Sequence, residues 1–187
     1  MKPSQVSELL AQLKLHYGIK NPYSIAVTGH CHLGDRANEV FVAQSFHTIL
    51  AFIQSNVRAK VSLFSGLALG ADTLCAEAAI ALGIPVEAVI AHDHLLETFP
   101  LGPARRQFER LLAQCQQVHH LPFDHSSNEA YMALGYWLVE HSDLLIAAWN
   151  GLPANGLGGT ADVVAYARSI GRPVLHLHTL THALSCA

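Results

Sequence analysis

The sequence predicts an α/β fold, a three-layer doubly wound and mostly parallel sheet of the Rossmann-like kind. Short apolar runs of strand length alternate with longer segments whose apolar residues recur at helical spacing. Glycine-rich turns join several strand ends to the helices that follow them. This alternation favours parallel pairing of the strands, with helices on both faces of the sheet.

One domain accounts for the whole chain. Its 187 residues are 51% hydrophobic and 13% charged, which suits a globular domain with a sizeable core. No internal repeat, low-complexity stretch or linker divides the sequence. We therefore expect a single domain over residues 1–187, with its core at about 24–177 and a short amphipathic helix at 4–15 before the core.

The first half of the core is expected to hold three strands and two helices. Residues 24–28 form the first strand, and Asp35 caps a long helix that runs to about residue 55. Residues 60–64 form the second strand. An alanine-rich helix follows Asp72 and ends at Gly83, and the third strand covers residues 85–90. The alanines predict a close approach of this helix to the sheet.

The second half repeats the pattern. Residues 94–103 contain two prolines and are expected to form a loop, before a helix at 104–116 and a weak strand at 118–121. The sequence SSNE at 126–129 matches a capping box for a helix that runs to about residue 140. A buried strand at 143–149, a helix that follows Gly159 and ends at Gly171, and a strand at 173–177 complete the prediction. The residues after 177 carry no clear pattern.

Charge, hydropathy and cysteine usage argue against several kinds of protein. The net charge is −3, with 11 Lys and Arg against 14 Asp and Glu, so no nucleic-acid surface is expected. No apolar run has the length of a transmembrane helix, and no signal-peptide core follows the first residues. The four cysteines lack C-x-x-C spacing, so we expect free thiols in a cytoplasmic protein rather than disulfides.

Histidine is unusually frequent, with 13 residues in the chain. Imidazole is a common metal ligand, so a metal site is one interpretation. The histidines lack the paired cysteines and the H-E-x-x-H spacing that make such a site specific, and the sequence favours no metal. Three pairs have the His-x-His spacing: His30 with His32, His92 with His94, and His176 with His178.

A glycine-rich stretch over residues 150–160 joins the strand at 143–149 to the next helix. At a helix N-terminus the first backbone N–H groups lack intrahelical partners, and the helix dipole favours negative charge. Gly158 and Gly159 let a ligand approach this backbone closely. The stretch is therefore a candidate phosphate site, and an ordinary turn with Thr160 as the helix cap is the alternative.

Three strand ends carry small or polar residues, at 28–30, 65–72 and 150–160. In an open α/β sheet, ligands bind beyond the carboxyl ends of the strands, near the point where the strand order reverses. We expect these ends to converge on a crevice for a phosphorylated small molecule. The chain has no G-x-x-x-x-G-K-[ST] sequence and no G-x-G-x-x-G after the first strand, which excludes a P-loop and a hydride-transfer Rossmann site.

The sequences SGLALGAD at 65–72 and GGTAD at 158–162 resemble the SLOG superfamily of Rossmann-like nucleotide-binding domains. Its members include the Lonely Guy cytokinin-activating hydrolases, DNA-processing protein A, molybdenum cofactor carrier proteins and sensor domains in bacterial defence. VTGH at 27–30 is similar to the branch whose first strand ends in Thr-Gly-His-Arg. The resemblance covers about residues 24–177, and it implies a phosphorylated ligand at the glycine motifs and a homo-oligomer.

The chain departs from the family pattern at two places. Cys31 stands where that branch has Arg after Thr-Gly-His, and Arg36 could replace this contact. Lonely Guy hydrolases carry a catalytic Glu three residues after the Thr of Gly-Gly-x-Gly-Thr, and Val163 occupies that place here. Asp162 is one residue away, and one residue turns a helical side chain by about 100°. The resemblance therefore implies binding more firmly than N-glycosidic hydrolysis.

We therefore predict a sensor or carrier module that binds a nucleotide or related phosphorylated small molecule without catalysis. One alternative is a nucleoside 5′-monophosphate phosphoribohydrolase, whose carboxylate would be Asp72 or Asp162. Another is a molybdenum cofactor carrier, whose ligand would be of the molybdopterin type. Asn155 could contact a base or ribose, although turn formation explains it equally well. The predicted ligand contacts are Thr28, Gly29, His30, Arg36, Ser65, Gly66, Leu67, Ala68, Gly70, Asp72, Asn150, Gly158, Gly159, Thr160 and Asp162.

Overall fold

A computed structural model describes residues 8, 23–154 and 157–186. The helix expected at 4–15 and the predicted contact Asn155 lie outside this described part. Within it, no helix is long and apolar enough to cross a membrane. The α/β architecture predicted from the sequence is confirmed by the described residues.

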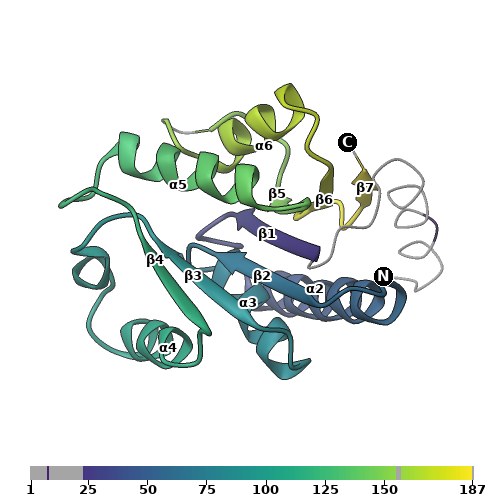
Figure 1. Cartoon of the computed structure of the whole chain (residues 1–187), viewed down its shortest axis with the longest axis horizontal. Helices are drawn as coiled ribbons and strands as arrows, with labels where there is room; N and C mark the ends of the chain where they lie inside the picture. Colours follow the sequence, from purple (N-terminus) through teal and green to yellow (C-terminus); the bar gives the residue numbers. More distant parts are fainter. Residues whose placement is uncertain (1–7, 9–22, 155–156, 187) are drawn as a thin grey trace.

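A single seven-stranded sheet forms the centre of the fold, in the order β4-β3-β2-β1-β5-β6-β7 (Figure 1). The first six strands pair in parallel, and β7 pairs with β6 in the antiparallel sense. The strand order reverses between β1 and β5, where Gly29 lies opposite Ala148. The strands are β1 (Tyr23–Gly29), β2 (Val61–Ser65), β3 (Val86–Ile90), β4 (Gln117–His120), β5 (Leu144–Trp149), β6 (Val174–His178) and β7 (Leu184–Cys186).

Helices cover both faces of the sheet, as the alternating pattern predicted (Figure 1). On one face α2, α3 and α4 pack over a core that includes Phe46, Ile49 and Leu63. On the other face α5 and α6 enclose a second apolar cluster that includes Leu138 and Val164. The helices are α2 (Arg36–Asn56), α3 (Ala71–Ala81), the short 3₁₀ helix η1 (Leu95–Thr98), α4 (Pro103–Leu112), α5 (Asn128–His141) and α6 (Thr160–Ser169).

Small side chains allow the helices to lie close to their neighbours. Ala76 and Ala79 of α3 are fully buried, in agreement with the close approach predicted for this helix. Between α5 and α6, a Cβ atom on Gly135 would come within 2.5 Å of the Cγ2 atom of Val163. The middle of α5 and the first turn of α6 are therefore held side by side at the carboxyl edge of the sheet.

The N-cap residue predicted from the sequence is correct for α2 and wrong for α5. Asp35 caps α2 as predicted, since its carboxylate accepts a hydrogen bond from the backbone N–H of Asn38 at 2.9 Å. At α5 the capping-box prediction is wrong by one residue. Ser127 is the cap and accepts from the N–H of Ala130 at 3.1 Å, whereas the Ser126 hydroxyl donates to the hydroxyl of Tyr131.

Candidate functional site

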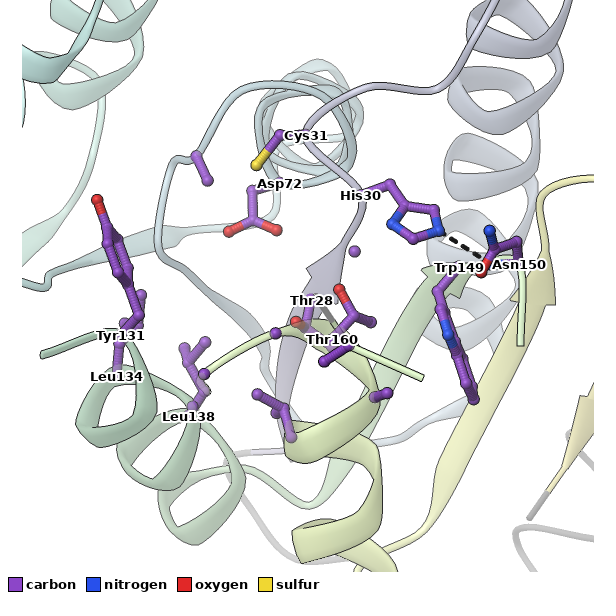
Figure 2. A pocket seen from close by; sticks show the side chains of 18 of the residues that line it. Thr28, His30, Cys31, Asp72, Tyr131, Leu134, Leu138, Trp149, Asn150 and Thr160 are labelled. Carbon is purple, nitrogen blue, oxygen red and sulfur yellow. Dashed lines mark hydrogen bonds between the residues drawn. The ribbon is translucent and has the colours of Figure 1, made fainter. Parts of the chain in front are cut away.

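A cavity of about 660 Å³ opens at the carboxyl edge of the sheet, beside the adjacent ends of β1 and β5. Figure 2 shows that Asp72, Thr28 and Thr160 come from three different elements and lie around the same space. The volume is that of an ordinary small-molecule site. Nine of the predicted contacts line it: Thr28, Gly29, His30, Ala68, Asp72, Asn150, Gly158, Gly159 and Thr160.

The N-terminus of α6 forms one wall of the cavity. Gly159 is the N-cap in an extended conformation, and no side chain caps the helix. The carbonyl oxygen of Gly159 accepts from the N–H groups of Asp162 and Val163 at 3.0 and 3.2 Å. Because the first N–H groups of a helix have no intrahelical acceptors, those of Thr160 and Ala161 can bind a ligand in the cavity.

Gly158 fixes the approach of α6 to α5. Its backbone has a φ of +86°, and a Cβ atom there would lie 2.9 Å from the backbone nitrogen of Met132. The N–H of Gly158 donates to the carboxylate of Asp162 at 3.1 Å. Asp162 therefore stabilises the turn before its own helix, and it is not among the residues that line the cavity. Val163, which stands where the hydrolases have their catalytic Glu, does line it.

The end of β1 supplies a second wall. A Cβ atom on Gly29 would lie 2.4 Å from the Cβ of Ala71 and 2.6 Å from the carbonyl oxygen of Ala148, so only glycine fits between α3 and β5. The N–H of Asn150 donates to Nε2 of His30 at 3.2 Å (Figure 2). This bond makes Nε2 the acceptor, so the proton of the neutral ring is assigned to Nδ1. His30 thereby joins the ends of β1 and β5.

The β2–α3 connection is packed tightly beneath the cavity rather than exposed to it. The hydroxyl of Ser65 accepts from the N–H of Leu67 at 3.1 Å, and both residues are fully buried. Gly70 has a φ of +81°, and a Cβ atom there would lie 2.4 Å from the carbonyl oxygen of His30. Four predicted contacts in this connection do not line the cavity, namely Ser65, Gly66, Leu67 and Gly70. The packing of these four residues holds Ala68 and Asp72 in place, and both of these residues line the cavity.

The N-terminus of α3 is already occupied by the protein. The N–H of Ala71 donates to the carbonyl oxygen of His30 at 3.1 Å, and the N–H of Thr73 donates to that of Ala68 at 3.2 Å. Of the helix N-termini of α3 and α6, the one that opens into the cavity is that of α6.

Asp72 is the buried ionisable group of the cavity, with 6% of its surface exposed. Burial raises the pKa of this carboxyl to about 7, and backbone hydrogen bonds from Ala68 and Gly66 oppose the rise only in part. Burial, and then the nearby Asp72 carboxylate, also raise the pKa of the Cys31 thiol. Asp72 therefore changes its charge near neutral pH, while the thiol beside it stays neutral.

Apolar and aromatic side chains form the remaining walls, and sequence reasoning missed most of them. Tyr131, Leu134 and Leu138 project from α5, and Trp149 ends β5 (Figure 2). Trp149 is only 7% exposed, and its indole N–H donates to the carbonyl oxygen of Leu152 at 2.7 Å. Trp149 therefore belongs to the core, and it also lines the cavity. The apolar face of α5 was visible in the sequence, but its position over the strand ends was not.

Arg36, the residue expected to stand in for the arginine of the family motif, is not among the residues that line the cavity. It begins α2, its side chain is 85% exposed, and it pairs with Glu39 at 3.1 Å. Cys31 does line the cavity, at the place of that arginine. Among the described residues that line the cavity, none is Lys or Arg. An anion bound there would thus be held by backbone N–H groups and uncharged polar side chains such as the hydroxyl of Thr160.

The histidine pairs do not form a metal centre among the described residues, which contain no group of three or more His, Cys, Asp or Glu side chains able to hold a metal. Nε2 of His176 contacts the carbonyl oxygen of Trp149 at 3.0 Å, and Nδ1 of His178 accepts from two backbone N–H groups. His92 is fully buried, and burial lowers its pKa. Its Nε2 lies 3.5 Å from the hydroxyl of Tyr131, behind the cavity wall.

No protein-family model and no curated protein matches the sequence. Three solved structures have the same fold. DNA processing protein A from Streptococcus pneumoniae is 20% identical, with a TM-score of 0.57 over 84% of this chain and 50% of its own. The molybdenum cofactor binding protein from Rippkaea orientalis is 17% identical, with a TM-score of 0.54 over 86% and 78%. A structural-genomics target named TM1055 is 13% identical, with a TM-score of 0.52 over 81% and 72%.

These likenesses confirm the Rossmann-like α/β fold that the sequence predicted, and they show that a DNA processing protein and a molybdenum cofactor binding protein share it. This chain spans only half the length of DNA processing protein A. Sequence identities of 20% and below are evidence for the fold alone, because one fold carries many unrelated functions.

Proposed function

We propose that the protein binds a nucleotide or related phosphorylated small molecule in this cavity and acts as a sensor or carrier. The observation that carries the proposal is the N-terminus of α6, which no side chain caps and which opens into the 660 Å³ cavity. Backbone N–H groups and the helix dipole both favour an anion at this position. A phosphate is the anion that this geometry accommodates without any cationic side chain.

The apolar and aromatic walls of the cavity suit a planar ring. Leu134 and Leu138 provide apolar surface, and Tyr131 and Trp149 provide aromatic surface. Such walls bury a flat heterocycle, while a few polar groups orient it. The solved structure of a molybdenum cofactor binding protein with the same fold supports keeping a pterin phosphate among the candidate ligands.

Hydrolysis of a nucleoside 5′-monophosphate is the second candidate function, and Asp72 favours it. Within the described part of the chain, Asp72 is the only carboxyl group that lines the cavity. A carboxyl with a pKa of about 7 is suited to proton transfer at neutral pH. Val163 argues against this function, because a valine cannot stabilise an oxocarbenium-like centre as the family's Glu does. We therefore place binding first.

Thermal unfolding with a panel of ligands tests the proposal. The panel holds nucleoside monophosphates, cyclic nucleotides, ADP-ribose and a pterin phosphate. A ligand at about 100 times its Kd adds roughly 2.7 kcal/mol to the free energy of unfolding, a rise of several degrees in Tm. We expect such a rise for at least one member of the panel.

Gly159→Asp provides the decisive variant. Gly159 has the extended backbone of an N-cap, where Asp is a favoured residue, so the ligand-free protein should keep its Tm. The added carboxylate would repel a phosphate at the same N–H groups and abolish the ligand-induced rise. Ala165→Asp adds the same charge at an exposed position of α6 and should leave the rise intact. A panel without any rise, or an equal rise in wild type and Gly159→Asp, contradicts the proposal.

The proposal also covers the oligomeric state of the protein and its binding to nucleic acid. We propose a homo-oligomer without a nucleic-acid partner, on the basis of the fold resemblance and of the net charge of −3. Light scattering of the purified protein tests the first point. Gel-shift titration with single- and double-stranded DNA tests the second.

A further inference from the structure

Asp72 occupies a position in the cavity that packing alone does not explain. Its side chain lies at the start of α3, is 94% removed from solvent, and is directed into the cavity (Figure 2). Buried carboxyl groups are rare unless a cation or several donors accompany them. Among the described residues that line the cavity, no Lys or Arg accompanies this one.

The partners of the Asp72 carboxyl are backbone groups on one side only. The N–H groups of Gly66 and Ala68 hydrogen-bond it, and a Cβ atom on Gly66 would lie 3.1 Å from its Oδ2. The titratable groups beside it are the thiols of Cys31 and Cys75, and the pKa of each is raised by burial and by Asp72. An ionised carboxylate accepts roughly four hydrogen bonds, so two N–H donors leave accepting capacity toward the cavity.

We propose that Asp72 is the specificity-determining contact of this cavity: it accepts hydrogen bonds from a donor-bearing group of the ligand, a sugar hydroxyl or a ring amine. The inference rests on the proposed function, and it adds which part of the ligand is selected. The α6 N-terminus then holds the phosphate, and Asp72 recognises the opposite, donor-rich part of the same molecule.

Ligand binding is expected to release a proton from the Asp72 carboxyl, because burial keeps this carboxyl partly protonated. Burial raises the pKa of the Asp72 carboxyl to about 7, so near neutral pH a large fraction of it is protonated. Hydrogen bonds from a ligand favour the ionised form and lower this pKa. Binding must then transfer the proton from Asp72 to the buffer. Affinity should accordingly rise as the pH rises through 7 and level off above it.

Isothermal titration calorimetry in buffers of different ionisation enthalpy measures this proton release directly. The probes are AMP, 2′-deoxyadenosine monophosphate, ribose 5-phosphate, GMP and IMP, with pyrophosphate as a probe that has only the phosphate contact. Wild type is compared with Asp72→Asn, and with Asp124→Asn as the control, since Asp124 is exposed and lies outside the cavity lining. The phosphate of a nucleotide also titrates near pH 6, so the signal of interest is the difference between wild type and Asp72→Asn.

We expect wild type and Asp124→Asn to release a fraction of a proton that Asp72→Asn does not release. Hydrogen bonds to a charged group predict about a tenfold to hundredfold loss of affinity in Asp72→Asn. The affinity for pyrophosphate should stay unchanged. If the wild-type protein binds 2′-deoxyadenosine monophosphate more weakly than AMP, the donor is a sugar hydroxyl. If it binds IMP more weakly than GMP, the donor is the ring amine.

The outcomes separate this inference from the proposed function. If the probes bind wild type and Asp72→Asn equally and without a difference in proton release, the inference is overturned while the proposed function stands. If no probe binds wild type, both are overturned. If Asp72→Asn fails to fold, proton release by the wild-type protein is compared between AMP and 2′-deoxyadenosine monophosphate and between GMP and IMP. The phosphates within each pair titrate alike, so a difference within a pair reports the Asp72 contact, and no difference in either pair overturns the inference.

Discussion

Burial makes the ionised form of the Asp72 carboxyl costly to the folded protein. Its pKa is raised from 3.8 to about 7 because burial disfavours the charged form. Functional sites often hold groups whose ionisation the fold disfavours and whose partner is a ligand. At the scale of single residues, this cost is measurable without knowing the ligand.

Asp72→Asn is expected to stabilise the ligand-free protein at alkaline pH. The folded state binds the Asp72 proton more tightly than the unfolded state, so the contribution of this group to stability is greatest below pH 3.8 and falls as the pH rises toward about 7. The whole shift corresponds to about 4 kcal/mol at most. Urea unfolding at pH 8 and pH 5 should show a larger gain for Asp72→Asn at pH 8. A gain that is equal at both values, or a loss at pH 8, would count against the raised pKa.

At the scale of elements, Gly70 joins the β2–α3 connection to the residues that follow β1. The β2–α3 connection passes directly against the residues after β1, and a Cβ atom on Gly70 would lie 2.4 Å from the carbonyl oxygen of His30 and 2.5 Å from that of Cys31. The N–H of Ala71 also holds the two segments together, because it donates a hydrogen bond to the carbonyl oxygen of His30. The positions of His30 and Cys31 at the cavity thus depend on this contact.

Gly70→Ala should lower the free energy of unfolding by roughly 2–5 kcal/mol, since it combines a positive φ with a backbone clash. Gly34→Ala is the matched control, because its φ of +88° is similar to the +81° of Gly70 but nothing lies within 4 Å of its Cβ position. Its cost should be about 1–2 kcal/mol, for the φ alone. Chemical denaturation measures the free energy of unfolding of both variants. Equal losses of free energy would show that the close contact at Gly70 contributes nothing to stability.

The elements were predictable where a local pattern defines them. The helical periodicity and the Asp35 cap predicted α2 to within a residue at each end. In contrast, β7 has three residues and exists through its antiparallel pairing with β6, which is a tertiary contact without a local signal. The cap of α5 was assigned to Ser126 because the capping-box spacing fits it, but the neighbouring serine makes the hydrogen bond.

The site was predictable to the extent that it follows from the topology. Residues that follow parallel strands must meet at one edge, and this brought Thr28, His30 and Asn150 to the cavity. The sequence could not separate residues that face the cavity, such as Asp72, from residues that pack beneath it, such as Ser65. The α5 wall depends on where a helix lies relative to the strand ends, and no local pattern carries that information.

At the scale of the whole molecule, the fold assembles an anion-binding helix end, a buried carboxyl and apolar walls around one cavity. The strand order 4-3-2-1-5-6-7 produces this convergence, because the crossovers on either side of β1 lead to opposite faces of the sheet. A crystal structure of the protein with the ligand that most raises its Tm tests the central claim most directly. We expect phosphate oxygens about 2.7–3.1 Å from the backbone nitrogens of Thr160 and Ala161. A ligand bound outside this cavity, or a phosphate placed away from the start of α6, would contradict it.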